Sequence, residues 1–275
     1  MKEAKRLSHK WLVVFSVIFC FSSCDTVPIT NRQRVNLVPD SVINSMSFSS
    51  YQDVISKSKL STDKRLTAKV RRVGERIQQA VEQYFRSEGR QDVLRGYKWE
   101  YNLIEDDAVN AWAMPGGKVA VYTGLLKVAR TDEDLAVVMG HEIAHAVAEH
   151  GSERLTLQWI AAGVGWGVEK MTEEQEAQRR AIFLGLYGLG VQYGALLPYS
   201  RTHESEADQL GLIFMALAGY DPHEAIPFWE DMAKQSKGDA PPELLSTHPS
   251  HETRIRRIRE QYLPQAMIYY TGDLR

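Results

Sequence analysis

Two histidines and a glutamate form the pattern in this chain whose residue types and spacing are best suited to chemistry. His141 and His145 lie four residues apart in the stretch VMGHEIAHAVAEHG. On an α-helix, residues with this spacing lie one turn apart on the same face, so both imidazoles can bind one metal ion. Glu142 lies about 100° further around the helix, where it can reach a water at the metal without being a ligand. The pattern predicts a zinc site in which Glu142 is the catalytic base.

The H-E-x-x-H pattern is typical of zinc peptidases, but two histidines with this spacing also occur on solvated helix surfaces. A helical context and a third ligand distinguish the two interpretations. Thr131, with Asp134 three residues later, forms a capping box that predicts the start of a helix just before the pattern. The required helical context is therefore present.

A catalytic zinc ion usually has three protein ligands and a fourth position for water. The stretch SRTHESEAD supplies Glu204 and Glu206 on a second predicted helix. We expect Glu204 to be the third ligand because Asp208, four residues on, lies on the same face and can hydrogen-bond the outer nitrogen of a ligand histidine. Glu206 points about 200° away around the helix, so we expect it to lie in solvent.

The N-terminal residues resemble a secretion signal, with the basic MKEAKR followed by the apolar run WLVVFSVIFCF. This run is shorter than the about 20 residues that a membrane-spanning helix needs. The stretch FSSC resembles a bacterial lipobox, which predicts a signal at residues 1–23 and lipidation of Cys24; an ordinary secretory signal with an incidental cysteine is the alternative. These features predict a periplasm-facing lipoprotein of the cell envelope, anchored by its lipid to the outer membrane rather than the inner membrane.

The rest of the chain predicts one α+β domain that is mainly helical. Residues 24–60 are polar and are expected to be a tether, and residues 61–275 are expected to fold. Apolar residues at intervals of three and four predict a long helix from about Ser61, and the alternation in YKWEYNLIE predicts a strand. A turn at Pro115–Gly117 predicts a β-hairpin. Two glycine-rich apolar stretches between residues 160 and 197 predict short helices or a flap near the active site, with a membrane re-entrant segment as the alternative.

Composition limits the classes of function. The chain has 33 basic and 35 acidic residues, a formal net charge of −2, and we expect no nucleic-acid partner. Only Cys24 would remain after cleavage of the predicted signal, so catalysis by a cysteine and stabilisation by a disulfide are both excluded for the mature chain.

Four motifs, in order, resemble family 48 of the metallopeptidases. They are NAWAMPGGKVAVYTGLL, the H-E-x-x-H pattern, E-x-x-x-D at residues 204–208 and STHPSHETRI. The resemblance runs from about Ser61 to Ile258 and implies a gluzincin-type zinc metallopeptidase domain with a small β-sheet and an active-site helix. It also implies one Zn²⁺ per chain, bound by His141, His145 and Glu204. No long apolar span follows the catalytic helix, so the membrane-embedded branches of the family fit less well than its compact members.

The same resemblance suggests that an exposed edge strand binds the substrate, through residues Asn110, Ala111, Trp112 and Ala113. An extended chain can pair with such an edge through main-chain hydrogen bonds and with little sequence preference. We therefore expect a quality-control peptidase whose partners are unfolded or damaged envelope proteins. The alternative is a zinc-bound chaperone or assembly factor with little proteolysis, but the intact Glu142 favours the enzyme.

In some family members, the histidine that matches His248 is implicated as an extra zinc ligand at the water position. This implies a self-inhibited resting state; a histidine that caps its loop, lines the substrate groove or stabilises the oxyanion is the alternative. Tyr199 and Arg201 are further candidates for the oxyanion. The remaining histidines are expected at the surface or behind the ligands: His150, His203, His223 and His251.

Overall fold

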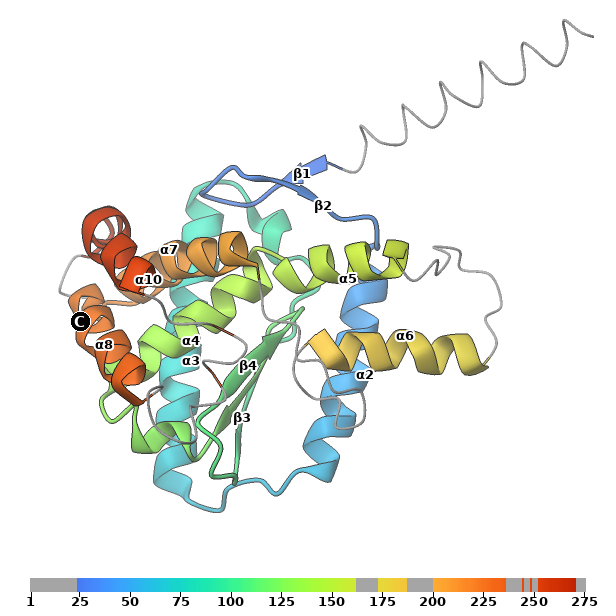
Figure 1. The fold of residues 1–275 in the computed structure, drawn as a ribbon, viewed down its shortest axis with the longest axis horizontal. Coiled ribbons are helices and arrows are strands. Elements are labelled where there is room, and N and C mark those ends of the chain that lie inside the picture. The colour runs from blue at the N-terminus through green and yellow to red at the C-terminus, as the bar shows by residue number, and fades with distance from the viewer. Residues whose placement is uncertain are drawn as a thin grey trace, which may run out of the picture.

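The computed structural model describes residues 24–161, 173–186, 200–235 and 252–270, together with Leu244 and His248. The described part is mainly helical and contains a three-stranded sheet between two groups of helices (Figure 1). This confirms the predicted α+β, mainly helical class. The expected signal at residues 1–23 lies outside the described residues, as do Tyr199 and His251.

The sheet consists of β3 (Glu100–Ile104), β4 (Ala111–Met114) and β5 (Lys118–Tyr122), in the order β3-β5-β4. Strand β3 runs parallel to β5, and β4 pairs antiparallel with β5. The turn between β4 and β5 requires glycine, because Gly116 and Gly117 have φ angles of 77° and 82°. The predicted hairpin is confirmed, and β4 lies at an edge of this sheet.

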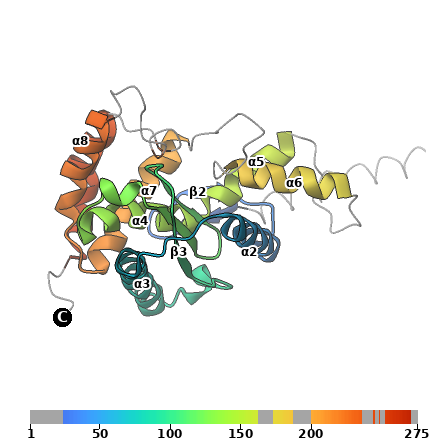
Figure 2. The same ribbon diagram turned by 90° about the horizontal axis from the view of Figure 1, so that it is seen from below.

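Helices cover both faces of the sheet. One face packs against α3 (Lys64–Ser87) and α4 (Asp132–Val147) through Tyr101, Leu103, Ala113, Val119 and Val121. The other face contributes Trp112, Met114 and Ala120 to a second core. Helices α2 (Asp40–Lys57), α5 (His150–Ala161) and α6 (Glu173–Leu186) complete this second core, and α2 and α6 lie beside each other in Figures 1 and 2.

Helix α4 is the central helix of the domain, since every residue from Leu135 to Val147 is buried. It begins with the predicted capping box: the Thr131 hydroxyl accepts from the Asp134 N–H, and the Asp134 carboxylate accepts from the Thr131 N–H, both at 2.9 Å. The H-E-x-x-H pattern therefore lies on a buried helix, which excludes the interpretation as two solvated surface histidines.

Helix α7 (Arg201–Leu217) packs on α4 at very close range. A Cβ atom on Gly140 would lie 2.8 Å from the carbonyl oxygen of Gly211, and one on Gly211 would lie 2.8 Å from the backbone nitrogen of His141. Only residues without a side chain permit this approach. The crossing brings the two helices that carry the predicted ligands together.

The segment expected to be a tether is instead part of the fold, and that expectation is corrected. It forms a two-stranded hairpin, β1 (Cys24–Thr26) and β2 (Gln33–Val35), followed by helix α2. Tyr51 is fully buried, and its hydroxyl donates to the Val119 carbonyl at 2.9 Å. The buried face of α2 also includes Ser47 and Ser50, so the helix lacks the apolar periodicity by which amphipathic helices are predicted.

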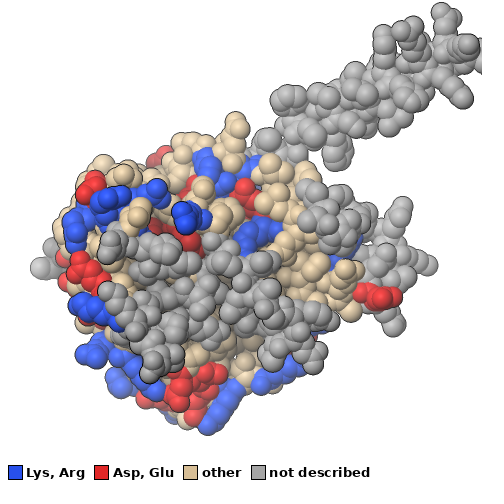
Figure 3. All heavy atoms as spheres, in the orientation of Figure 1, with Lys and Arg blue, Asp and Glu red and all other residues tan. Residues whose placement is uncertain are grey.

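The other helices of the described residues are short or peripheral. They are η1 (Gln91–Leu94), η2 (Leu125–Lys127), η3 (Pro222–Glu224), α8 (Ala225–Gln235), α10 (Glu252–Arg257), the π-helical turn η4 (Ile258–Tyr262) and α11 (Leu263–Ala266). Parts of the glycine-rich region, residues 162–172 and 187–199, lie outside the described residues. Among the described helices, none combines the length and apolar character that crossing a bilayer requires. Acidic and basic side chains are interspersed on the face that Figure 3 shows.

Candidate metal centre

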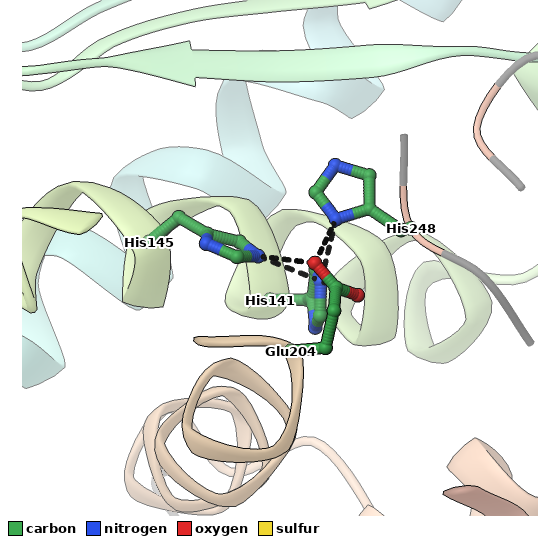
Figure 4. A group of neighbouring side chains, drawn as sticks. All are labelled: His141, His145, Glu204 and His248. Atoms are coloured by element: carbon green, nitrogen blue, oxygen red, sulfur yellow. Dashed lines mark hydrogen bonds and ion pairs between the residues drawn. The ribbon is translucent and has the colours of Figure 1, made fainter. Parts of the chain in front are cut away.

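Four side chains from three parts of the chain converge at the crossing of α4 and α7 (Figure 4). His141 Nε2 lies 3.0 Å from His145 Nε2 and 3.2 Å from His248 Nδ1. Glu204 Oε1 lies 2.8 Å from His248 Nδ1 and 3.3 Å from His145 Nε2. All four side chains are buried. The two H-E-x-x-H histidines, the predicted third ligand and His248 thus present one ligand atom each to a common point.

This donor set fits a zinc ion. Four ligand atoms around tetrahedral zinc, at about 2.0–2.2 Å from the metal, lie about 3.3 Å from one another. The atoms observed here have separations close to that value, and three nitrogens with one carboxylate oxygen are ligands that zinc prefers. Among the described residues, Glu204 Oε2 is buried without a hydrogen-bond partner, which leaves it available to a cation.

The outer nitrogen of His141 contacts a carboxylate and a guanidinium. Asp208 Oδ1 lies 3.0 Å from His141 Nδ1, which is the contact expected from the spacing between Glu204 and Asp208. Arg254 donates to Asp208 at 2.6 and 2.8 Å, lies 3.7 Å from Glu204 Oε2, and stacks on the ring of Trp229. Sequence reasoning did not single out Arg254, although it is the arginine of the STHPSHETRI motif.

The outer nitrogen of His145 faces a different set of partners. His145 Nδ1 lies 2.8 Å from His150 Nδ1, and His150 Nε2 lies 2.8 Å from Glu206 Oε2. Glu206 is only 5% exposed, so its expected position in solvent is wrong. A helical projection of α7 alone cannot reveal that α5 and the N-terminal hairpin cover this face.

The pKa shifts of His145 and Glu204 favour the protonation states in which these side chains bind a metal ion. Burial lowers the pKa of His145 well below its usual value, which keeps the ring neutral. Burial alone would raise the pKa of Glu204, but the charge of His248 and hydrogen bonds from three histidines outweigh it and hold this pKa well below its usual range. Burial also lowers the pKa of His141, but hydrogen bonds to Asp208 and Glu204 raise it overall, so a proton competes with metal at this ring.

Glu142 lies beside the four-residue cluster. Its carboxylate lies 3.4 Å from His248 Nε2, and its helix α4 packs against strand β4. Its Oε1 atom is buried without a hydrogen-bond partner among the described residues. Burial raises the pKa of Glu142 to about 7, near the value that suits a general base at neutral pH.

The other residues singled out from the sequence lie either at the surface or in buried positions. Arg201 is exposed in the first turn of α7. His203 is buried and bonded to Glu153, and His223 is exposed beside Asp221. The edge-strand residues were expected to be exposed, and this expectation is wrong, because all four are buried: Asn110, Ala111, Trp112 and Ala113.

Comparisons with known proteins agree with this geometry. The model of Peptidase family M48 matches residues 71–262. The mitochondrial metalloendopeptidase OMA1 of Schizosaccharomyces pombe is 33% identical, over 94% of this chain and 72% of the relative. The human metalloendopeptidase OMA1 is 27% identical over 91% of this chain and 48% of its own length. The beta-barrel assembly-enhancing protease of Escherichia coli is 30% identical over 59% of this chain and 34% of its own length.

The chain belongs to Peptidase family M48, since the family model covers most of it and the fission yeast relative matches across nearly all of it. It is a zinc metalloendopeptidase, as the family and the His-His-Glu-His cluster indicate together.

The location expected from the N-terminal residues is corrected by the same comparisons. Relatives that match 91–94% of the chain are mitochondrial proteins by name, which contradicts the expected periplasm-facing lipoprotein of the bacterial outer membrane. Short basic and apolar leaders occur in more than one targeting system, so they specify a compartment less well than a match over the whole chain. Lipidation of Cys24 stays a prediction.

Proposed function

We propose that this metalloendopeptidase cleaves extended segments of misfolded proteins, which bind along the outer edge of β4, the strand that packs against the helix of Glu142. Hydrogen-bonded and non-hydrogen-bonded pairs alternate along antiparallel strands. Tyr122 N–H donates to Asn110 C=O at 3.1 Å, so the backbone groups of Ala111 and Ala113 point away from β5. The position of β4 supports this proposal most strongly, because this edge strand of the sheet packs against α4, the helix that carries Glu142.

The catalytic step follows from the positions of these groups. A zinc ion held by His141, His145 and Glu204 would polarise the scissile carbonyl and lower the pKa of its water toward about 7. Glu142 takes the proton from the attacking water and later passes it to the leaving amine. The β4 edge holds the substrate backbone in an extended form, so that the scissile bond lies over Glu142.

We propose in addition that His248 keeps the resting enzyme latent. Four protein ligands are typical of structural zinc sites, whereas catalytic sites keep one position open. His248 is buried within the cluster. Leu244, four residues earlier, is also buried and donates its N–H to the Val109 carbonyl at 3.1 Å, next to the start of β4. Leu244 must therefore release the Val109 carbonyl before a substrate can pair with the whole edge.

The test is degradation of unfolded casein by the purified full chain, with and without a zinc chelator. We expect cleavage that the chelator abolishes and added zinc restores. The Glu142→Gln variant is the matched control, because it keeps all proposed ligands. Cleavage by that variant at the wild-type rate would contradict the assigned role of Glu142.

A zinc-bound chaperone with little proteolysis is the second candidate, and the fourth potential ligand His248 is the observation that favours it. The two functions differ in one measurement. A chaperone would suppress aggregation of unfolded protein equally well in the wild type and in Glu142→Gln, with no casein fragments from either.

A further inference from the structure

A second cluster of buried and half-buried polar side chains lies behind the metal centre, on the outer side of His145. It combines two histidines and two carboxylates from α5 and α7 with two residues of the N-terminal hairpin: His150, Glu153, His203, Glu206, Thr30 and Arg32. His150 is fully buried, and Glu206 is 5% exposed. Such groups are rarely buried unless they are paired, so the pairing indicates what the cluster does.

The contacts form a continuous chain from the zinc ligand to the hairpin. His145 Nδ1 lies 2.8 Å from His150 Nδ1, and His150 Nε2 lies 2.8 Å from Glu206 Oε2. Arg32 Nε donates to the same Glu206 oxygen at 2.7 Å. The hydroxyl of Thr30 donates to the other oxygen of Glu206.

Only one arrangement of protons satisfies this chain when His145 binds a metal. The Nε2 atom of His145 faces the metal centre and must offer a lone pair there, so its Nδ1 carries the proton. That N–H donates to His150 Nδ1, and a neutral His150 then carries its own proton on Nε2. The Nε2–H group donates to Glu206, which accepts as a carboxylate. Each member thus fixes the tautomer and ring orientation of the one before it.

The two H-E-x-x-H histidines are therefore supported in different ways. His141 contacts the carboxylate of Asp208 directly, at 3.0 Å. The outer nitrogen of His145 is linked to the carboxylate of Glu206 through the intervening ring of His150. The carboxylate at the end, Glu206, depends on a cation that comes from a distant part of the chain.

Arg32 provides that cation, and a turn in the N-terminal hairpin orients its side chain. It pairs with Glu206 at 2.7 Å and with Glu153 at 2.9 Å, so one guanidinium offsets two carboxylates. The turn from Val27 to Arg32 is closed by a backbone hydrogen bond of 2.8 Å between these two residues. Within it Ile29 has a φ of 69°, which is uncommon for a β-branched residue and indicates that tertiary contacts hold the turn.

We infer that His150 and Glu206 are positioning residues for the ligand His145. Through its ion pair with Glu206, Arg32 connects the N-terminal hairpin to this support and so contributes to zinc affinity. This inference rests on the proposed role of His145 as a zinc ligand. Outer partners of ligand histidines typically change metal affinity by about 10–100-fold when they are removed. A cluster that only fastened the hairpin would instead change stability and leave metal affinity unaltered.

The chain offers a matched pair of histidines for the test. His150 and His203 are both buried and stack on each other with ring centroids 4.4 Å apart. Each histidine is bonded to one carboxylate that Arg32 also contacts, His150 to Glu206 and His203 to Glu153. His150 in addition contacts the proposed zinc ligand His145. Replacing each with phenylalanine preserves a ring and removes the hydrogen bonds. A difference between the two variants therefore measures the contact with His145.

The experiment measures the zinc dissociation constant of the full chain by competition with a chromophoric chelator. Thermal unfolding of the metal-free protein reports stability separately. We expect His150→Phe to weaken zinc binding by about 10–100-fold and His203→Phe to change it by less than about threefold. His150→Gln retains an acceptor and a donor and should recover most of the lost affinity. The visible spectrum of the Co²⁺-loaded protein should change in His150→Phe and remain close to wild type in His203→Phe.

A second pair of variants tests whether the N-terminal hairpin contributes to zinc affinity. Arg32→Ala removes the cation from Glu206, whereas Arg34→Ala removes a neighbouring anchor that binds the Ala148 carbonyl and Glu149. We expect Arg32→Ala to weaken zinc binding and Arg34→Ala mainly to lower the unfolding temperature. If His150→Phe does not fold, Glu206→Gln against Glu153→Gln provides the same comparison with side-chain volume preserved.

The inference would be overturned if His150→Phe and His203→Phe bound zinc with equal affinity. Where this pair does not fold, equal affinity in Glu206→Gln and Glu153→Gln would have the same meaning. Either result would leave the zinc centre intact. A wild-type chain that binds no zinc would instead reject the proposed centre itself. The two failures are therefore distinguishable without an activity assay.

Discussion

Gly140 and Gly211 bring the backbones of α4 and α7 into direct contact one residue before the first histidine of the metal centre. A Cβ on Gly211 would lie 2.8 Å from the backbone nitrogen of His141 and 2.9 Å from its Cα. Both contacts are with backbone, which cannot rotate away. The separation of the two helices, and with it the distance from Glu204 to His141 and His145, is set at this point.

Gly211→Ala should therefore force α4 and α7 apart. Overpacking of this kind destabilises by about 1–3 kcal/mol, and the displaced Glu204 should also weaken zinc binding. The control is Gly185→Ala in α6, where an added Cβ meets nothing within 4 Å; this change should stabilise by up to about 1 kcal/mol through helix propensity. Urea unfolding with parallel zinc titration measures both effects. Equal effects of the two variants would contradict the assigned role of the helix crossing.

Glu142→Gln should abolish proteolysis and, at alkaline pH, stabilise the metal-free protein. Burial raises the pKa of Glu142 to about 7 in the folded chain, above its unfolded value of about 4.3. A raised carboxyl pKa destabilises the fold as pH rises through this window, because ionisation must then occur in a buried site. The variant should gain on the order of 1–3 kcal/mol over wild type at pH 8 and little at pH 4. A stability difference that is the same at both pH values would exclude this explanation.

Activity of the wild type should fall as the medium becomes more acidic, because the base must be ionised to accept a proton. The positive charge of bound zinc lowers the pKa of Glu142, so the acid limb of kcat/KM should lie below about 7. Rates of peptide cleavage measured between pH 5 and pH 9 provide the test. A rate that rises steadily toward pH 5 would contradict a glutamate base.

His248→Ala should raise the rate of casein cleavage or self-cleavage while zinc stays bound, since three ligands remain and one position opens. If His248 instead stabilises the oxyanion, the same change should lower the rate by about 100-fold or more with zinc retained. Unchanged rate and unchanged zinc coordination would rule out both roles.

Arg254→Met should destabilise the protein, although methionine keeps apolar contact with Trp229. The change leaves Asp208 and Glu204 buried without the guanidinium that now lies 2.6 Å and 3.7 Å from them. Breaking a buried ion pair on one side costs about 3–5 kcal/mol. Urea unfolding measures this loss, and bound zinc should reduce it by offsetting Glu204. A loss below about 1 kcal/mol would show that other groups neutralise these carboxylates.

Local patterns in the sequence predicted the parts of this molecule that depend on local physics. The capping box at Thr131, the glycine turn between β4 and β5, and the helical spacing of His141 and His145 are all short-range features, and the structure contains each of them. The sequence also favoured Glu204 over Glu206 as a residue facing the histidines, and Glu204 is the one that lies beside them.

The errors concern residues whose partners are remote. Glu206 has polar partners 56 and 174 residues away, at His150 and Arg32, which no helical projection can supply. Helix α2 was missed because serines occupy part of its buried face. Arg254 was overlooked within a recognised motif because its partner Asp208 lies on another helix.

X-ray absorption at the zinc edge, combined with elemental analysis of the purified full chain, tests the central claim most directly. We predict one zinc per chain, with nitrogen and oxygen ligands at about 2.0–2.2 Å and the multiple-scattering features of three imidazoles. Glu204→Ala should lower the zinc content, and His248→Ala should retain the metal with one imidazole fewer. A stoichiometric zinc bound without histidine, or a chain that purifies and refolds without any affinity for zinc, would contradict the account.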